Sequence, residues 1–375
     1  KMIWITFIIL ILYCFFTIWL SKGLRKNKEK FSTILTGKVN EQSDLFLSVI
    51  VPFRNEEKRI SYLLRSIKNQ SLANFKFEII LVDDQSNDGS RKIIEEFIGF
   101  NSKINTKLAR IPIGIGGGKK KAIEIGVSQS KGNFIIQTDA DCTADSEWLI
   151  GIYNFINIIN PDLLILPVFI EPSSNILSKF DSMEYASLQV VGIGMASQNS
   201  PILCSASNLA FRKSFYENTK AKRTDENLSS GDDIFLLQAA IRDKSKIDYC
   251  INSSICVSTP SLNSLENIIA QRKRWVSKNS SIQDLVYQIV AAFGFLTNLI
   301  LIYILLFKSE FFLLLFVLKL IADYFLLKTF YTLINKPFQT IPFVLNSFLY
   351  PFYLIYIVFT AFSTKNSWRG RIVKN

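Results

Sequence analysis

The sequence predicts an α/β domain with a mostly parallel sheet and flanking helices, joined to transmembrane helices at the N- and C-terminal ends. Three observations support this prediction. Short apolar runs alternate with segments of helical spacing between residues 45 and 280. Three of these apolar runs end in polar or acidic residues. Long runs without charge stand near both ends of the chain.

The composition limits the possible functions. The chain has 375 residues, a formal net charge of +12, 49% hydrophobic residues and no histidine. An apolar fraction this high excludes intrinsic disorder. Without histidine the chain cannot build a Ser-His-Asp triad, a His-ligated zinc site or an imidazole base, so acid–base chemistry falls to other side chains. The cysteines form no Cys-x-x-Cys pair, which is typical of reduced thiols.

The N-terminal run Ile3–Leu20 contains no charge and is nearly long enough to cross the roughly 30 Å hydrocarbon core of a bilayer. No small-residue cleavage site comes after it, which favours an anchor over a cleaved signal peptide. The next segment, Lys22–Lys30, is basic, and the positive-inside rule places it and the central part of the chain in the cytoplasm. We therefore expect an anchor at 1–22, a basic juxtamembrane linker at 23–44 and an α/β domain at 45–280.

The C-terminal third, 281–375, is expected to form a membrane domain of two or three helices with a basic tail. Its apolar runs are Leu285–Phe307, Phe311–Leu327 and Ile341–Phe362. Three spans here would place the basic tail outside, so we expect one segment to be interfacial or re-entrant and the tail to be cytoplasmic. Lys319 and Asp323 share a helix face and are interpreted as a structural ion pair.

In the central domain, three buried strands are predicted at Leu47–Val51, Phe77–Val82 and Phe134–Thr138. Apolar residues at helical spacing predict helices between them, at 60–67, 90–97 and 121–128. This alternation predicts right-handed βαβ units and a parallel sheet. In such sheets ligands bind beyond the carboxyl ends of the strands.

The three predicted strands are followed by Arg54-Asn55-Glu56, Asp83-Asp84 and Asp139-Ala140-Asp141. We expect these sets to meet at one edge of the sheet. Clustered carboxylates repel one another and require a cation, and an Asp-x-Asp pair suits a hard divalent ion with oxygen ligands. Such an ion in turn suits a diphosphate, whose leaving charge it neutralises.

Seven segments together carry a family resemblance. They are VPFRNE (51–56), VDDQSNDGS (82–90), GKKKAIEIG (118–126), TDADC (138–142), SNLAFRK (207–213), SGDD (230–233) and QRKRW (271–275). In this order the sequence resembles the inverting glycosyltransferases of family 2, which have the GT-A nucleotide-sugar fold. The Q-x-x-R-W motif before membrane helices is similar to the branch of polysaccharide synthases and lipid glycosyltransferases.

The resemblance implies an enzyme at the cytoplasmic face of the cell membrane. Its donor would be a nucleotide sugar, and we expect a UDP-sugar. Its acceptor would be a membrane lipid or a polysaccharide, and its cofactor would be Mg²⁺ or Mn²⁺. The implied donor-binding residues are Pro52, Asn55, Glu56, Asp83, Asp84, Lys119, Asp139 and Arg274. Asp141 would bind the metal and Asp233 would be the catalytic base. The implied acceptor-side residues are Asp232, Gln271 and Trp275.

The sequence departs from the family pattern at two places. Some relatives have a histidine after or near the metal-binding aspartate, where this chain has Cys142. The metal shell is therefore expected to consist of Asp141, diphosphate oxygens and water. Gly231-Asp232-Asp233 replaces the commoner Thr-Glu-Asp but keeps the last aspartate.

Each motif also has a structural interpretation. Asp83 and Asp84 could hold a turn, and Asp232-Asp233 could cap the next helix. Residues 271–275 could form an interfacial helix with Arg272 and Lys273 on lipid headgroups. Ser207–Lys213 could be core packing, and most of Lys119–Lys121 could be solvated.

Two other functions compete with single transfer to a lipid or glycan: a processive polysaccharide synthase, and a non-catalytic membrane-tethered protein that binds nucleotide sugars. Because Asp141 and Asp233 are both present, catalysis is favoured. The net charge also raises nucleic-acid binding, but the basic residues flank the membrane segments, so acidic lipid is the expected partner and nucleic acid is not.

Overall fold

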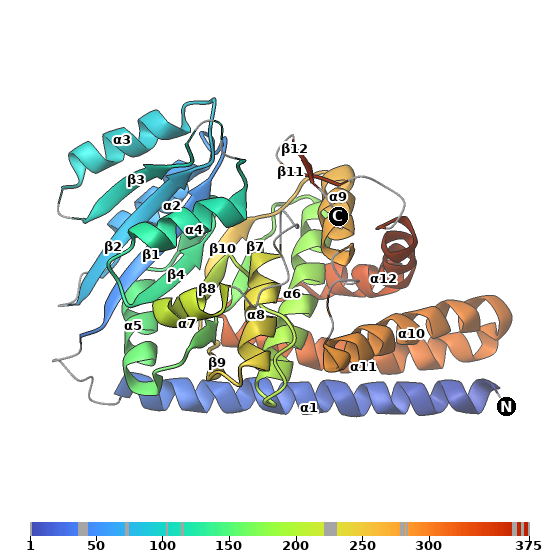
Figure 1. The fold of residues 1–375 in the computed structure, drawn as a ribbon. Helices are drawn as coiled ribbons and strands as arrows, with labels where there is room; N and C mark the ends of the chain where they lie inside the picture. The colour runs from blue at the N-terminus through green and yellow to red at the C-terminus, as the bar shows by residue number, and fades with distance from the viewer. Residues whose placement is uncertain are drawn as a thin grey trace. The chain divides into compact units, whose positions relative to one another are not determined.

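The structure of the protein is a computed structural model with two compact units (Figure 1). The sheet unit comprises 27–169 and 203–260, and the helical unit comprises 1–26, 170–202 and 261–375. The structure describes residues 2–36, 44–71, 75–102, 104–112, 114, 116–220, 231–277, 282, 284–361, 366–368 and 371–373. Both units are discontinuous in sequence, so each is assembled from segments far apart in the chain.

The sheet unit is built on a seven-stranded sheet in the order β3-β2-β1-β4-β8-β6-β9. Its strands are β1 (Phe46–Phe53), β2 (Lys76–Asp83), β3 (Thr106–Arg110), β4 (Phe134–Thr138), β6 (Leu163–Ile165), β8 (Asn208–Arg212) and β9 (Ile247–Tyr249). All neighbours are parallel except β8, which is antiparallel to β4 and β6. The three predicted strands are β1, β2 and β4. They are adjacent and parallel, so their carboxyl ends meet at one edge as expected.

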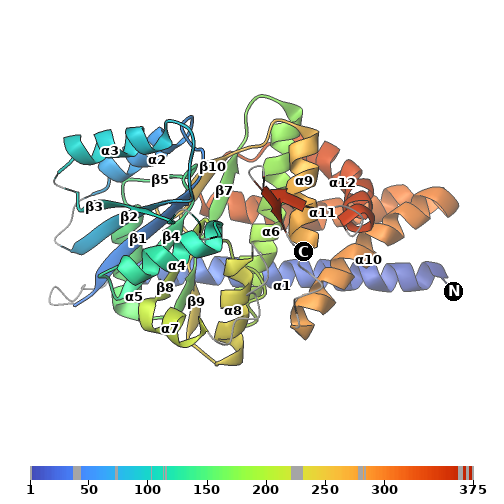
Figure 2. The same ribbon diagram turned by 45° about the horizontal axis from the view of Figure 1, so that its top comes forward.

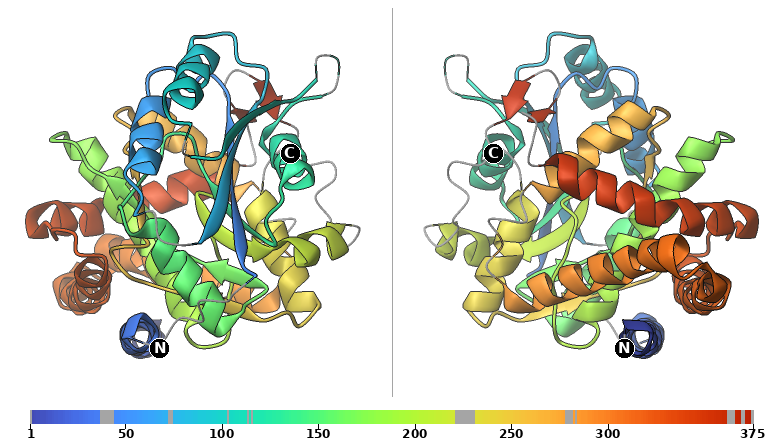
Figure 3. Two further views of the ribbon diagram at one scale, coloured as in Figure 1. Left: turned by 90° about the vertical axis from the view of Figure 1, so that its left-hand side faces the viewer. Right: turned by 90° about the vertical axis from the view of Figure 1, so that its right-hand side faces the viewer.

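Helices cover both faces of the parallel half, which explains its continuous apolar strands. Figure 3 shows α2 (Ile60–Lys68) and α3 (Ser90–Phe100) on one face and α4 (Lys119–Gln129) on the other. A Cβ atom on Gly126 would lie 2.5 Å from the Ile50 side chain, so α4 packs directly against β1. This close packing fixes the first residue of α4, Lys119, near the carboxyl edge of the sheet.

The remaining elements of the sheet unit surround this core. They are α5 (Trp148–Ile159), α7 (Lys213–Asn218) and α8 (Asp232–Arg242). Figure 2 also shows a small three-stranded sheet in the order β5-β10-β7, formed by β5 (Thr143–Ala144), β10 (Val257–Pro260) and β7 (Val168–Glu171). The five cysteines, all of which lie among the described residues, are not joined by disulfides.

The N-terminal helix α1 (Met2–Thr36) continues well beyond the apolar run that the sequence marks. Its Asn27 side chain donates to the Tyr249 carbonyl at 3.0 Å and accepts the Ile251 N–H at 2.7 Å. Asn27 is fully buried. These two bonds hold the last turns of α1 on the segment after β9, so the expected boundary at residue 22 is not the end of a helix.

The helical unit contains the first part of α1 and α6 (Ile176–Ala196), α9 (Leu265–Val276), α10 (Leu285–Phe307), α11 (Ser309–Leu333) and α12 (Thr340–Ala361). Two short strands, β11 (Asn366–Trp368) and β12 (Arg371–Val373), come after α12. By length and composition, three of the described helical segments could cross a membrane: Trp4–Asn27, Leu285–Phe307 and Thr340–Ala361. Charged residues interrupt α11, which is not among them.

The predicted ion pair in α11 is present. Lys319 Nζ lies 2.6 Å from Asp323 Oδ2, and the Tyr13 hydroxyl of α1 donates to Asp323 Oδ1 at 2.6 Å. Both charged side chains are largely buried, at 8% and 15% exposed. The pair is therefore a structural contact that ties α1 to α11.

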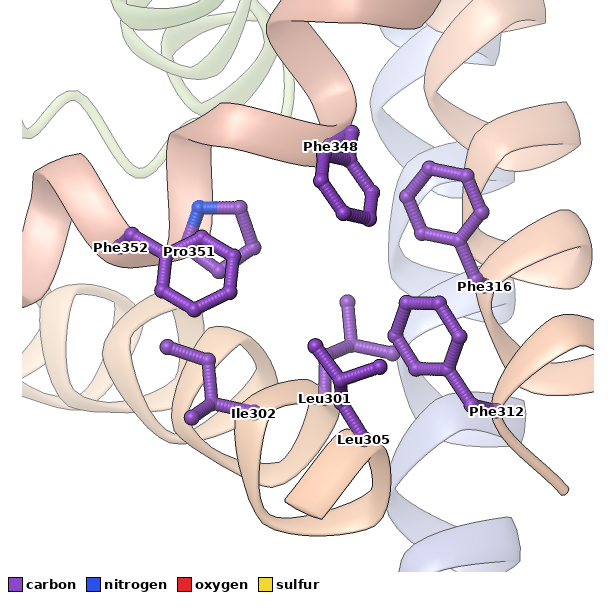
Figure 4. Close-up of a pocket in the computed structure, with 8 residues that line it drawn as sticks. All are labelled: Leu301, Ile302, Leu305, Phe312, Phe316, Phe348, Pro351 and Phe352. Carbon is purple, nitrogen blue, oxygen red and sulfur yellow. The ribbon is translucent and has the colours of Figure 1, made fainter. Parts of the chain in front are cut away.

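A small pocket between α10, α11 and α12 is lined by apolar residues (Figure 4). Phe312 and Phe316 of α11 face Phe348 and Phe352 of α12, and the Phe316 and Phe348 rings meet edge to face at 6.1 Å. Pro351 lies inside α12 at the same place. Because its lining residues are apolar, this pocket is a packing feature of the helical unit.

Candidate active site

The loops after β1 and β2 are bonded to each other at the carboxyl edge of the sheet. Arg54 Nη1 donates to the backbone carbonyls of Asp84 at 2.6 Å and Gln85 at 2.9 Å. The Glu56 N–H donates to Ser90 Oγ at 2.7 Å. Asn55 and Gln85 adopt positive φ angles of 55° and 57°, which these tight turns require. The turn from Pro52 to Glu56 is therefore rigidly placed.

Asp83 and Asp84 shape these loops from the inside. They are 3% and 1% exposed. Asp83 Oδ1 accepts the Ser86 N–H at 2.8 Å, so the turn interpretation holds for this residue. Asp84 Oδ1 accepts the Gly118 N–H at 3.0 Å and thereby ties the β2 loop to the start of α4.

Lys119, the first residue of α4, forms the centre of the site. Its Nζ lies 2.5 Å from Asp139 Oδ1, at the end of β4. The Ser207 hydroxyl donates to the other oxygen of Asp139 at 2.6 Å. Lys119 and Asp139 are 21% and 27% exposed at their side chains, so the pair is accessible to a ligand.

Asp232 and Asp233 reach the same site from the start of α8. Gln137 of β4 donates to Asp232 Oδ2 at 3.0 Å. Asp233 accepts the backbone N–H groups of Ala206 at 3.0 Å and Ile234 at 2.9 Å. The N-cap of α8 is Gly231, with φ 102° and no side-chain cap, so the capping interpretation is replaced by two carboxylates in the first helical turn. There the helix dipole favours negative charge.

The charges of this cluster are strongly coupled. Burial by itself lowers the pKa of Lys119. The charges of Asp139, Asp232 and Asp233 together outweigh this effect, so the pKa lies above its ordinary value. Lys119 is therefore a permanent ammonium. Since it faces three carboxylates, the site has a surplus of negative charge that a second cation would balance.

Asp141 is the candidate metal ligand. Its carboxylate is 21% exposed and lies 3.4 Å from the guanidinium of Arg59. The neighbouring Cys142 is buried, and burial together with the charge of Asp141 raises the pKa of its thiol, which makes it a poor metal ligand. Among the described residues no three His, Cys, Asp or Glu side chains gather in a metal-binding group. One accessible carboxylate fits Mg²⁺ or Mn²⁺ that arrives with a diphosphate.

Comparison with known proteins identifies the domain. Residues 48–219 match the family model described as glycosyl transferase family 2. The chain contains a glycosyltransferase family 2 domain. The matched range begins in β1 and ends after α7, so it contains the carboxyl edge of the sheet with Asp84, Lys119 and Asp139.

Three curated relatives share part of this family 2 domain. They are a poly(ribitol-phosphate) β-N-acetylglucosaminyltransferase, TarS, of Staphylococcus aureus (33% identical over 119 residues), a dolichyl-phosphate β-glucosyltransferase of Dictyostelium discoideum (29% over 120) and an undecaprenyl-phosphate 4-deoxy-4-formamido-L-arabinose transferase of Proteus mirabilis (38% over 96). The matches cover 32%, 30% and 25% of this chain. They span only 20%, 36% and 28% of the relatives' own lengths.

The fold agrees with that of a solved glycosyltransferase. The mannosyltransferase PcManGT from Pyrobaculum calidifontis, in complex with GDP-Man and Mn²⁺, superposes with a TM-score of 0.54 over 93% of this chain and 98% of that chain, at 12% identity. At this identity the likeness concerns the fold alone. The predicted GT-A fold with a mostly parallel sheet is confirmed.

The residues of the Q-x-x-R-W motif belong to α9 in the helical unit. Gln271, Arg274 and Trp275 are partly exposed there. Arg272 is only 2% exposed and pairs with two carboxylates of α6, so the alternative interpretation that placed it on lipid headgroups is wrong. Ser230, also part of a predicted motif, lies outside the described residues, as do Lys365 and Arg369 of the basic tail.

Sequence reasoning missed three contacts of the candidate site. Gln137 bonds Asp232, Ser207 bonds Asp139, and Arg59 lies beside Asp141. Ser207 stands in a segment that the resemblance marks, so its motif was a usable signal. Gln137 and Arg59 are marked by nothing in the local pattern, because their partners are far away in sequence.

Proposed function

We propose that the protein is a membrane-bound glycosyltransferase that moves a sugar from a nucleoside-diphosphate donor to a membrane lipid or glycan, with inversion. The observation that carries the proposal is the cluster of Lys119 with Asp139, Asp232 and Asp233 at the carboxyl edge of a family 2 sheet. An ammonium group suits a diphosphate, and a carboxylate beyond it suits an acceptor hydroxyl.

In this proposal the donor lies along the loops after β1, β2 and β4. The turn of Pro52, Asn55 and Glu56 contributes to the nucleotide pocket. Asp83 and Asp84 are buried and act by holding its loops in place. Lys119 and Asp139 contact the ribose, diphosphate or sugar from the accessible side. The proposed donor is a UDP-sugar.

The reaction is an attack by an acceptor hydroxyl on the anomeric carbon, from the face opposite the nucleoside diphosphate. Asp233 accepts the hydroxyl proton during the attack, and Asp232 orients the acceptor. The two N–H groups bonded to Asp233 hold its carboxylate in one orientation. Attack from the opposite face inverts the configuration at the anomeric carbon.

Asp141 would hold a divalent cation, Mg²⁺ or Mn²⁺, which supplies positive charge for the departing diphosphate. Arg274 is assigned to the diphosphate, and Gln271 and Trp275 to the acceptor. These three roles come from the family motif on α9 and remain predictions.

The membrane setting supports a lipid or lipid-linked acceptor. Two of the relatives are named for transfer to dolichyl phosphate and undecaprenyl phosphate, and a third for poly(ribitol phosphate). With Trp4–Asn27, Leu285–Phe307 and Thr340–Ala361 as spans, a cytoplasmic catalytic domain also gives a cytoplasmic tail. This arrangement places α11 at the interface or as a re-entrant segment.

The test is a screen of nucleotide sugars on membranes that contain the full chain, with lipid and polymer products analysed by mass spectrometry. A lipid that gains one sugar would support the proposal. A long polymer would instead identify a processive synthase. Binding of a nucleotide sugar without transfer to any acceptor would identify a non-catalytic binding protein and contradict the proposal.

A further inference from the structure

A buried cluster of three charges joins α9 to α6. The Arg272 Nη2 atom lies 2.7 Å from Asp181 Oδ1 and 2.6 Å from Glu184 Oε2, and Arg272 Nε donates to Glu184 Oε2 at 2.7 Å. The three side chains are 3%, 0% and 7% exposed. Asp181 and Glu184 lie three positions apart, so they share one face of α6 and meet the guanidinium together.

Further hydrogen bonds hold Asp181 and Arg272 in this cluster. The second oxygen of Asp181 accepts the Leu262 N–H at 2.8 Å, and Arg272 Nη1 donates to the side-chain oxygen of Gln271. Burial by itself lowers the pKa of Arg272. The charges of Glu184 and Asp181 together outweigh this effect, so the pKa lies above its ordinary value. A buried charge group of this kind adds little net stability, yet it fixes one geometry because a missing partner leaves a charge unpaired.

The fixed guanidinium also holds an aromatic ring. Arg272 Cζ lies 4.3 Å from the centre of the Trp275 ring, within the range of a cation–π contact. The ring of Tyr185, which follows Glu184 on α6, lies 5.8 Å from that of Trp275. Trp275 itself is only partly buried. Its indole is therefore supported by Arg272 and Tyr185 and keeps part of its surface accessible.

We propose that Arg272, Asp181 and Glu184 act as positioning residues that set the orientation of the Trp275 indole. Arg272 contacts the Trp275 ring directly, and the two carboxylates of α6 fix the plane of its guanidinium. This inference rests on the proposed function, in which Trp275 contacts the acceptor. It assigns to α6 a role in acceptor binding through α9, although no α6 residue belongs to the marked motifs.

The test follows Trp275 by fluorescence in the full chain, purified in detergent. For each protein, acrylamide quenching is compared with that of the same protein carrying Trp275→Phe, and the difference reports on Trp275 alone among the five tryptophans of the chain. We expect the near-isosteric change Glu184→Gln to raise the Trp275 quenching constant at least twofold. Arg272→Met should raise the quenching constant further. Arg272→Lys should give a value between those of wild type and Arg272→Met, because Lys keeps the charge but lacks the planar guanidinium.

The matched control is Lys107→Met, which breaks an ion pair of 2.6 Å between the partly exposed Lys107 and the buried Glu78 in the sheet unit. It should lower the melting temperature without changing the Trp275 signal. Unchanged quenching in Glu184→Gln, or an equal rise in the Lys107→Met control, would overturn the proposal. If Arg272→Met does not fold, Glu184→Gln and Arg272→Lys decide.

An activity measurement separates this inference from the proposed function. Once an acceptor has been identified in the product screen, Glu184→Gln should raise its KM several-fold and leave the KM of the nucleotide sugar unchanged. A changed Trp275 signal in a protein that transfers no sugar would support the positioning role and contradict the proposed function. A normal acceptor KM together with a normal Trp275 signal would reject the positioning role alone.

Discussion

Lys119 Nζ lies 2.5 Å from Asp139 Oδ1 and joins the first residue of α4 to the residue that follows β4. The contact joins the loop before α4 to the loop after β4. It also places one ammonium group in front of Asp139, Asp232 and Asp233, whose charges raise its pKa. The charge balance of the whole site therefore depends on Lys119.

Replacing Lys119 tests this charge balance. We expect Lys119→Met to weaken UDP binding by about 10-fold or more, because a charge-assisted hydrogen bond contributes about 1.5–3 kcal/mol. Isothermal titration calorimetry with UDP measures the effect. Lys121→Met is the matched control, since Lys121 is on the same helix but pairs with Glu124 at 3.3 Å. Equal weakening in both variants would indicate a general charge effect and contradict the assignment.

Asp233 is expected to be the base. Asp233→Asn is nearly isosteric and should leave folding and UDP affinity close to wild type, although its single amide oxygen can accept from only one of the Ala206 and Ile234 N–H groups. Transfer should fall by about 10²–10⁴, the usual contribution of general-base assistance. Donor affinity and transfer rate are measured on one preparation. Transfer within a few-fold of wild type would rule out Asp233 and direct attention to Asp232.

Asp141 is expected to be the protein ligand of the metal. Asp141→Ala should abolish the dependence of turnover on Mg²⁺ or Mn²⁺ and weaken Mn²⁺ binding, which electron paramagnetic resonance measures without turnover. Asp145→Ala is the control, because Asp145 is an exposed carboxylate four positions further along the chain. A wild-type metal response in Asp141→Ala would contradict the metal assignment.

Glu78 gives a prediction on acid stability. It is fully buried and accepts hydrogen bonds from Lys107 at 2.6 Å and Ser48 at 2.8 Å. Burial by itself raises the pKa of Glu78. The hydrogen bonds from Lys107, Lys131 and Ser48 together outweigh this effect, so the pKa lies below its ordinary value. The stabilisation is therefore present above the unfolded pKa of about 4.3 and is lost as the pH falls through the lower folded value.

The measurement for Glu78 is the melting temperature between about pH 3 and pH 7, in wild type and in Glu78→Gln. The variant should be less stable near neutral pH, and its melting temperature should fall less steeply in acid, because it lacks the titrating group. Parallel curves would show that the carboxylate of Glu78 does not contribute to acid unfolding.

Membrane topology is tested with reporter fusions after Lys30 and after Asn375. Both should report a cytoplasmic location, because the two spans after the catalytic domain, Leu285–Phe307 and Thr340–Ala361, return the chain to the side on which that domain lies. An external signal after Lys30 would contradict the use of cytoplasmic nucleotide sugars. An external signal only after Asn375 would instead make α11 a fourth span.

The sequence alone determined the parallel half of the sheet. The strand at Phe134–Thr138 was predicted with its observed bounds, and those at Leu47–Val51 and Phe77–Val82 lie within β1 and β2. Buried parallel strands are short continuous apolar runs, so their signal is local. Because adjacent parallel strands share a carboxyl edge, the meeting of Asp84 with the start of α4 could also be expected from order along the chain.

The tertiary structure decided the partners of the charged groups. Ser207 and Asp139 are 68 residues apart, Gln137 and Asp232 are 95 apart, and Arg272 and Asp181 are 91 apart. Residues 271–275 resemble a basic interfacial helix in sequence. Only the tertiary structure shows that Arg272 is buried and paired with carboxylates of α6. Local patterns record whether a segment is apolar, but the sign and distance of a charge's partner depend on which distant segments pack together.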